Sequence, residues 1–258
     1  MNNGRSPLAY KNEAFIDGWS GRSLRLLSEY LEPLDRLGHE KIRDTIVFFG
    51  SARIRETGPL ARYYHEAREL ARLVTQWSDG LEPPTRRFVV CTGGGPGIME
   101  AANRGAADAG GKTIGLNIAL PFEQSPNPYI TPELNFEFHY FFMRKFWFAY
   151  LAKALIVFPG GFGTLDELTE ILTLAQTQKL EKRIQIILYG SDFWNELINF
   201  EAMVKHGVIS REDLELFEFA DSPAAALARL KPFLEENYLQ PHQVRAAEEL
   251  PDIAKSRI

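Results

Sequence analysis

The chain has 258 residues, of which 45% are apolar and 24% charged, so it is typical of globular proteins and long enough to bury one large core. Its net charge of −5, without a dense run of Lys and Arg, excludes a broad attraction to nucleic acid. No secretory signal or uninterrupted membrane span is visible, and the single cysteine, Cys91, cannot form an internal disulfide. We therefore expect a cytoplasmic protein with neither a membrane nor a nucleic-acid partner.

The two ends of the chain are expected to be appendages of one central domain. Residues 1–40 contain a single amphipathic helix, at about 23–37, and form an N-terminal helical extension. Residues 239–258 form a polar C-terminal tail with a short acidic cluster. The domain itself is expected over residues 41–238.

Short apolar runs alternate with helical patterns through the central domain. Runs rich in β-branched or aromatic residues predict buried strands at 45–49, 88–91, 113–116, 155–158 and 184–188. Helical periodicity is found at 60–77, 96–109, 140–151, 164–176, 193–205 and 222–236. This alternation predicts an α/β fold, a doubly wound parallel sheet with helices on both faces.

Two glycine-rich turns follow the second and the fourth predicted strand. The first reads Thr-Gly-Gly-Gly-Pro-Gly over residues 92–97, with Pro96 suited to a first helical turn, and the second reads Pro-Gly-Gly-Phe-Gly-Thr over 159–164. Both precede a helix, where free backbone N–H groups bind anions. Two such turns on one sheet edge predict a phosphate cradle. The alternative is that the glycines serve only tight turning.

Other nucleotide-binding signatures fit the chain poorly. Neither turn has the Gly-x-Gly-x-x-Gly spacing of a dinucleotide site, so a mononucleotide is a better prediction than NAD. The triplet Gly111-Lys112-Thr113 resembles the end of a P-loop, but position 106 is alanine where that motif needs glycine, and a strand follows instead of a helix.

Arg144 and Lys145 lie in an aromatic segment, residues 141–148, in which Tyr140 and Phe148 share the helical face of Arg144. Burying an unpaired charge costs several kcal/mol, so Arg144 should meet a carboxylate or a ligand phosphate. The alternatives are cation–π packing and a plain ion pair.

Glu167 follows Thr164 by three residues, which is the spacing of a capping box. In that interpretation the glutamate bonds back to the helix start. In the other, a carboxylate in the first helical turn lies beside an anion bound by the amides of residues 160–164. The five histidines show no metal spacing, so we expect no metal, and Cys91 is expected to be a small buried apolar residue.

The second turn, together with residues 165–167, resembles the Pro-Gly-Gly-x-Gly-Thr-x-x-Glu motif of the LOG (Lonely Guy) family, cytokinin riboside 5'-monophosphate phosphoribohydrolases often labelled lysine decarboxylase-like. The Arg144-Lys145 pair, fifteen residues before Pro159, matches as well. The resemblance extends from residues 48–51 through 93–100 to about residue 188.

This resemblance implies a Rossmann-like fold, usually a homodimer, and hydrolysis of the N-glycosidic bond of a purine nucleoside 5'-monophosphate, AMP or cytokinin-type, to free base and ribose 5-phosphate. No cofactor is implied. Arg144 and Glu167 would be the catalytic pair. The residues implied to bind substrate are Ser51, Gly93, Gly94, Gly95, Gly97, Lys145, Gly160, Gly161, Gly163 and Thr164.

The chain departs from the plant-type pattern in two places. Residues 146–148, Phe-Trp-Phe, replace a smaller or acidic residue, and the loop 123–132 is longer, so bulky aromatics could fill a prenyl pocket. The aromatic stripe of residues 136–150 also exceeds what one helix packs into its own core, which favours a homodimer that buries it.

Two other functions remain as alternatives. The first is a non-catalytic nucleotide or cofactor carrier, because similar turns bind ligands without chemistry. The second is a pyridoxal-phosphate lysine decarboxylase, for which Lys145 is the only lysine near the motifs.

Overall fold

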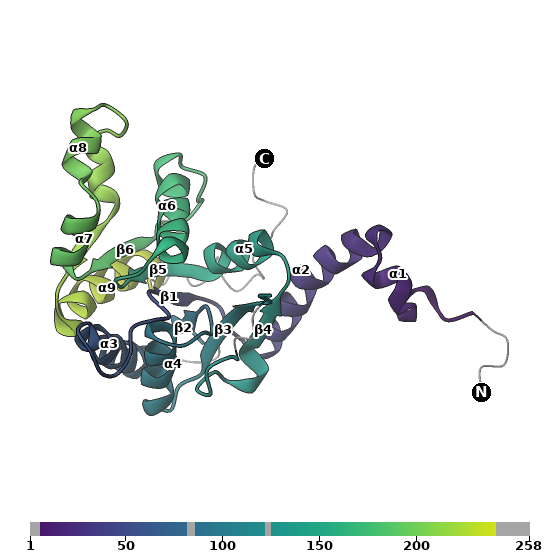
Figure 1. Cartoon of the computed structure of the whole chain (residues 1–258). Helices are drawn as coiled ribbons and strands as arrows, with labels where there is room; N and C mark the ends of the chain where they lie inside the picture. The colour runs from purple at the N-terminus through teal and green to yellow at the C-terminus, as the bar shows by residue number, and fades with distance from the viewer. Residues whose placement is uncertain (1–5, 82–85, 122–124, 241–258) are drawn as a thin grey trace.

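The computed structural model describes residues 6–81, 86–121 and 125–240, in which seven parallel strands form one sheet (Figure 1). The strand order is β4-β3-β2-β1-β5-β6-β7. In chain order the strands are β1 (Thr45–Phe49), β2 (Val89–Thr92), β3 (Thr113–Ile118), β4 (Asn135–Phe138), β5 (Ala152–Val157), β6 (Gln185–Tyr189) and β7 (Glu218–Ala220).

All five predicted strands are present, whereas β4 and β7 are not predicted by the sequence. Burial alternates along β4, so it lacks a continuous apolar run, and β7 has only three residues. Both strands lie at the ends of the strand order, so among the described residues each pairs with a strand on one side only.

The helices match the predicted segments with two exceptions. The N-terminal 40 residues, expected to contain a single helix, contain the short α1 as well as α2. The expected helix over 193–205 is two helices, because Ile198 is extended and the Asn199 side chain caps a new start by accepting from the Ala202 N–H. The helices are α1 (Glu13–Asp17), α2 (Arg22–His39), α3 (Ala61–Asp79), α4 (Ile98–Asp108), α5 (Phe141–Leu151), α6 (Phe162–Gln176), α7 (Ser191–Leu197), α8 (Phe200–Lys205) and α9 (Pro223–Tyr238). No helix in the described ranges combines the length and apolarity needed to cross a membrane.

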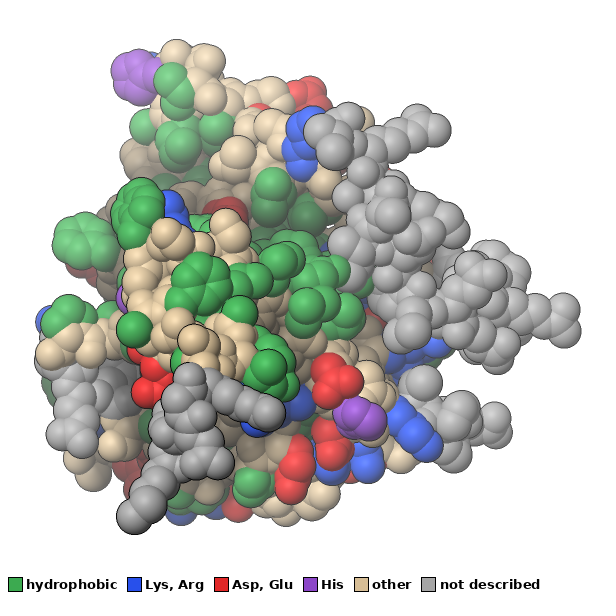
Figure 2. Space-filling view, turned by 90° about the vertical axis from the view of Figure 1, so that its right-hand side faces the viewer, with side chains coloured by type: hydrophobic (Ala, Val, Ile, Leu, Met, Phe, Trp, Pro, Cys, Tyr) green, Lys and Arg blue, Asp and Glu red, His purple; other side chains and the backbone are tan. Residues whose placement is uncertain are grey.

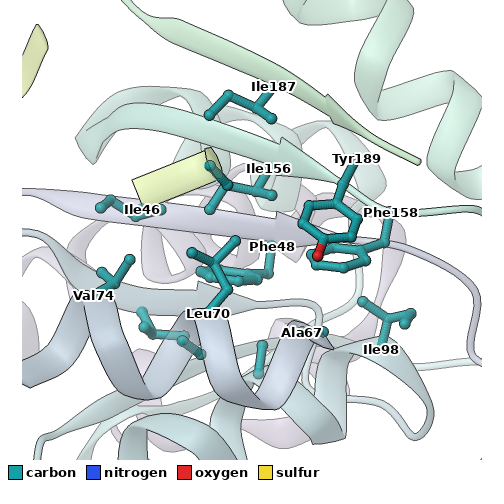
Figure 3. Close-up of a cluster of buried hydrophobic side chains, with 14 of the residues drawn as sticks. Ile46, Phe48, Ala67, Leu70, Val74, Ile98, Ile156, Phe158, Ile187 and Tyr189 are labelled. Carbon is teal, nitrogen blue, oxygen red and sulfur yellow. The ribbon is translucent and has the colours of Figure 1, made fainter. Parts of the chain in front are cut away.

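The sheet has a buried core on each face. On one face α3, α4 and α9 cover the central strands, and side chains such as Phe48, Leu70 and Ile156 fill the space between them (Figure 3). On the other face Phe49, Leu155 and Trp147 join a second core made with α2, α5, α6 and α7. The predicted α/β fold, a Rossmann-like doubly wound parallel sheet with helices on both faces, is confirmed.

The chain reverses its direction of travel across the sheet between β1 and β5. Strands β2 to β4 are added on one side of β1, and β5 to β7 on the other. Such a switch point leaves a crevice at the carboxyl ends of the strands, where open α/β sheets bind ligands. Here the Ser51 N–H, after β1, donates to the Pro159 carbonyl, after β5, at 3.0 Å.

Candidate active site

The first glycine turn, after β2, is closely packed by the protein itself. Gly94 and Gly97 have φ angles of +74° and +73°, which L side chains rarely adopt. A Cβ atom at Gly94 would lie 2.1 Å from Asn117 Oδ1, and one at Gly97 would lie 2.4 Å from the Ser51 carbonyl oxygen. The fold alone therefore requires both glycines.

The helix after this turn offers fewer free amides than the sequence suggests. Helix α4 starts at Ile98, so Pro96 precedes the helix, and its expected place in the first turn is wrong. The Ile98 N–H donates to the Ser51 carbonyl at 3.1 Å, and the Gly94 N–H donates to Thr92 Oγ1 at 3.0 Å. These two N–H groups are therefore already paired within the protein.

Asn127 fixes the same turn from a loop more than thirty residues away. Its side-chain Nδ2 donates to the carbonyls of Gly94 and Gly95 at 3.0 and 3.1 Å, and its backbone N–H donates to Gly94 at 2.8 Å. Asn127 is buried and also bonds Asn103, which joins it to Thr92. Sequence reasoning does not identify this residue, and its only local signal is its position between two prolines.

The second glycine turn, after β5, leaves open space. A Cβ atom at Gly160 would lie 2.0 Å from Thr164 Oγ1, but at Gly161 and Gly163 it would meet no atom within 4 Å. Helix α6 starts at Phe162, and its N-cap residue Gly161 makes no side-chain cap. The first N–H groups of α6 have no intrahelical partner, and with the helix dipole they attract an anion.

Glu167 is not part of a capping box. Because α6 starts at Phe162, Thr164 is already its third residue, and Glu167 is the sixth, one turn further than expected. The Glu167 side chain is buried, at 8% exposure. Burial raises the pKa of this carboxyl to about 7, although the positive charges of Arg144 and Lys145 oppose the rise. Near neutral pH the group can therefore both accept and release a proton.

Arg144, the fourth residue of α5, extends over the ends of β2 and β3. Its Nε donates to the Leu116 carbonyl at 2.7 Å and its Nη2 to the Gly93 carbonyl at 3.5 Å, which uses two of the five guanidinium N–H donors. The cation–π alternative is present, since the group lies 5.2 Å from the Phe148 ring centroid, and Glu167 acts on it electrostatically. Burial lowers the pKa of Arg144, and Glu167 counteracts that effect.

Lys145 connects α5 to α6. Its Nζ lies 2.8 Å from Asp166 Oδ2 and 2.9 Å from Glu170 Oε2. Burial disfavours the ammonium, but the hydrogen bonds to Asp166 and Glu170 outweigh it and raise the pKa of Lys145. A Schiff base with pyridoxal phosphate needs a neutral amine, so this geometry opposes the decarboxylase interpretation.

The remaining predicted residues lie around the same crevice or in the core beneath it. Ser51 Oγ accepts from the Arg53 N–H at 3.0 Å and lies between the two turns. Cys91 is buried in β2, where burial raises the pKa of its thiol. Within the part of the chain that the structure describes, no group of three or more His, Cys, Asp or Glu residues could hold a metal ion.

These features define a class of protein: a Rossmann-like α/β protein with an anion-binding helix N-terminus beside a half-buried arginine and a buried carboxyl group. Comparison with known sequences gives the family. A family model described as "Possible lysine decarboxylase" matches residues 99–230, just over half of the chain. The chain therefore belongs to this family, which includes the LOG proteins.

Curated relatives agree with this assignment, and solved structures share the fold. The chain is 27% identical over 202 residues to a probable cytokinin riboside 5'-monophosphate phosphoribohydrolase, LOG4 of Oryza sativa subsp. japonica, covering 78% of this chain and 81% of the relative. It is also 27% identical to the phosphoribohydrolase LOG3 of Arabidopsis thaliana, covering 75% and 84%. A Moco carrier protein from Chlamydomonas reinhardtii shares the fold, with a TM-score of 0.50 and 21% identity, covering 75% of this chain and 99% of that one.

Proposed function

We propose that the protein hydrolyses the N-glycosidic bond of a purine nucleoside 5'-monophosphate, AMP or cytokinin-type, to free base and ribose 5-phosphate. One observation carries the proposal: the open N-terminus of α6 begins five residues before a buried carboxyl group with a pKa of about 7. The names of the curated relatives support the same reaction.

The 5'-phosphate binds at the start of α6. The N–H groups of residues 162–164 and the hydroxyl of Thr164 supply donors, and Gly161 and Gly163 leave room for the phosphate to approach the backbone. Because the overall charge is negative, this local site and the nearby Arg144 supply the attraction that the protein as a whole lacks.

Glu167 acts at the anomeric carbon. Cleavage of this kind passes through an oxocarbenium-like state, which a nearby carboxylate stabilises. The ionised Glu167 also directs a water molecule to C1' and takes its proton. The water oxygen then bonds to C1' as the bond from C1' to the base nitrogen breaks. The proton that Glu167 took from the water passes to the departing base nitrogen, which restores the carboxylate.

Arg144 orients the nucleotide from the opposite side of the crevice. Its guanidinium is anchored to the Leu116 carbonyl and retains donors for the sugar or the departing base. It also favours the ionised form of Glu167.

The first test is to incubate the protein with AMP, other nucleoside monophosphates and isopentenyl-AMP, followed by chromatography for free base. We expect Glu167→Gln and Arg144→Ala each to lower turnover by about 10³-fold, because each removes a group that acts at the reacting sugar. The matched control is Glu196→Gln, which neutralises an exposed carboxylate on α7 and should keep wild-type turnover.

Three other results would redirect the proposal. Full turnover by Glu167→Gln would exclude the mechanism. Tight AMP binding without release of base would support a carrier instead. Absorbance of bound pyridoxal phosphate in protein given that cofactor would support a decarboxylase.

We further propose that the protein works in the cytoplasm as a homodimer. The aromatic stripe supports the dimer less than expected, because the protein's own α2 packs on Phe146 and Trp147. Phe141 and Phe142 remain about half exposed, and Phe162 is 92% exposed, so these three supply the apolar surface for a partner copy. Light scattering measures the mass directly.

A further inference from the structure

Helix α2 lies outside the region that the family model matches, yet it packs against the helix that carries Arg144. It lies beyond the β4 edge of the sheet (Figure 1). One side of α2 faces β4 and α5, whereas Leu24, Leu27 and Leu31 on its other side remain exposed. Figure 2 faces this end of the molecule and shows apolar side chains gathered on it.

The Glu29 carboxylate of α2 caps the start of α5. It accepts hydrogen bonds from the backbone N–H groups of His139, at 2.7 Å, and Tyr140, at 3.2 Å. Tyr140 is the N-cap residue of α5 and provides no cap through its own side chain. Glu29 therefore supplies, from 111 residues earlier in the chain, both an acceptor and the negative charge that a helix N-terminus favours.

Two further contacts hold the same helix. The indole Nε1 of Trp147 donates to the Glu29 carbonyl at 3.0 Å. The Tyr30 ring packs on Trp147 and on Phe146, with centroids 5.9 and 5.7 Å apart. Helix α2 therefore holds α5 at two places, just before its start, where Glu29 caps it, and at its middle, at Phe146 and Trp147. A sliding movement of the helix would break one of these contacts.

Arg36 of α2 fixes the strand that leads into α5. Its guanidinium donates to the carbonyls of Glu133, at 2.7 Å, and Asn135, at 3.0 Å. It also lies 4.3 Å from the ring centroid of Phe136 in β4. The segment before α5 is thus held to α2 as well.

A short chain of hydrogen bonds joins this clamp to the candidate active site. The Tyr140 N–H donates to Glu29, and the Tyr140 carbonyl accepts from the Arg144 N–H at 3.2 Å. The Arg144 side chain then reaches the Leu116 carbonyl. The position of the guanidinium is therefore set at one end by β3 and at the other by the helix start that Glu29 caps.

We propose that Glu29 is a positioning residue for Arg144, and that α2 clamps α5 so that the guanidinium faces the nucleotide in one orientation. This inference rests on the proposed function, because Arg144 is taken to orient a nucleoside monophosphate. The clamp comes from the N-terminal part of this chain, and it cannot be predicted from the two glycine turns or from the Arg144-Lys145 pair.

A double-mutant cycle on AMP affinity tests the link between the two residues. The parent for calorimetry is the Glu167→Gln protein, so that AMP is not consumed. Glu29→Ala, Arg144→Ala and the two changes together are each introduced into this parent. We expect Glu29→Ala to weaken AMP binding about tenfold when Arg144 is present and less than twofold when it is absent, since interacting residues are not additive. Equal losses in both backgrounds, or no loss in either, would overturn the proposal.

Two variants guard against a general loss of structure. Glu29→Gln keeps one acceptor oxygen and should lose less affinity than Glu29→Ala. Asp35→Asn removes a negative charge from an exposed position of the same helix, where Asp35 pairs with His39, and should bind AMP like the parent protein. Loss of affinity in Asp35→Asn equal to that in Glu29→Ala would show a nonspecific charge effect and overturn the proposal.

Amide hydrogen exchange tests the clamp without any ligand. In Glu29→Ala we expect faster exchange at residues 139–144 and unchanged exchange in α6. Unchanged exchange at residues 139–144 would overturn the clamp itself. If the wild-type protein releases no base from AMP, the proposed function fails, and the affinity cycle and the exchange data still decide the role of Glu29.

Discussion

The two glycine turns look alike in sequence and differ in what their glycines are needed for. In the first turn, a side chain at Gly94 or Gly97 would collide with the protein itself, and Asn127 and Thr92 already bond its backbone groups. In the second turn, Gly161 and Gly163 face empty space, and the first amides of α6 have no cap. A glycine that the fold does not require indicates the place left for a ligand.

The largest expected effect is on stability, and it tests whether close packing requires Gly94 in the first turn. We expect Gly94→Ala to lower the free energy of unfolding by about 4 kcal/mol, from the positive φ angle and the clash with Asn117 together. Gly110 is the matched control, because its φ is +79° but no atom lies within 4 Å of its added Cβ. Gly110→Ala should cost only about 1 to 2 kcal/mol. Equal losses in urea unfolding would show that packing does not require Gly94.

A smaller effect comes from the titrating carboxyl group beside the second turn. The folded-state pKa of Glu167, about 7, lies above the ordinary value of 4.5, so the folded protein binds this proton more tightly than the unfolded chain. Its contribution to stability is therefore greatest below about pH 4.5 and is lost as the pH rises through 7. Relative to Glu167→Gln, the wild type should lose on the order of 2 kcal/mol between pH 5 and 8. Parallel stability curves for the two proteins would contradict the raised pKa.

The smallest effect on stability has the opposite sign. Gly163→Ala should stabilise α6 by up to about 1 kcal/mol, because alanine is the better helix former and its Cβ meets nothing. The same methyl group enters the space assigned to the phosphate, so AMP affinity should fall about tenfold. Gly38→Ala, at an equally open position in α2, should not change affinity. Unchanged AMP affinity in Gly163→Ala would show that the phosphate does not bind at the start of α6.

The sequence predicts the central strands because each is a continuous run of apolar, mostly β-branched or aromatic residues, as in β1 and β6. It also predicts that the two turns, with Glu167 just after the second, belong to one edge of the sheet, because parallel strands end on the same side. The place of Arg144 in the same site is implied only by the family resemblance. The spacing of Thr164 and Glu167 suggests a cap that does not form, because Gly161 is the N-cap and α6 begins at Phe162. Thr164 is therefore already the third helical residue.

The contacts that hold the site in place cannot be predicted from local patterns. Asn127 and the Gly94 carbonyl are 33 residues apart, and Glu29 and Tyr140 are 111 apart. Each contact exists only because the sheet brings distant segments together. A buried asparagine or a half-buried glutamate on a helix has no distinguishing spacing of its own.

The backbone of Ser51 has a consequence for how the site receives a ligand. Its N–H is bonded to Pro159 and its carbonyl to Ile98, so one residue ties the exit of β5 to the entry of α4. The two walls of the crevice therefore cannot open independently. A ligand enters a gap whose width is already set, and little of its binding free energy is lost in ordering the protein around it.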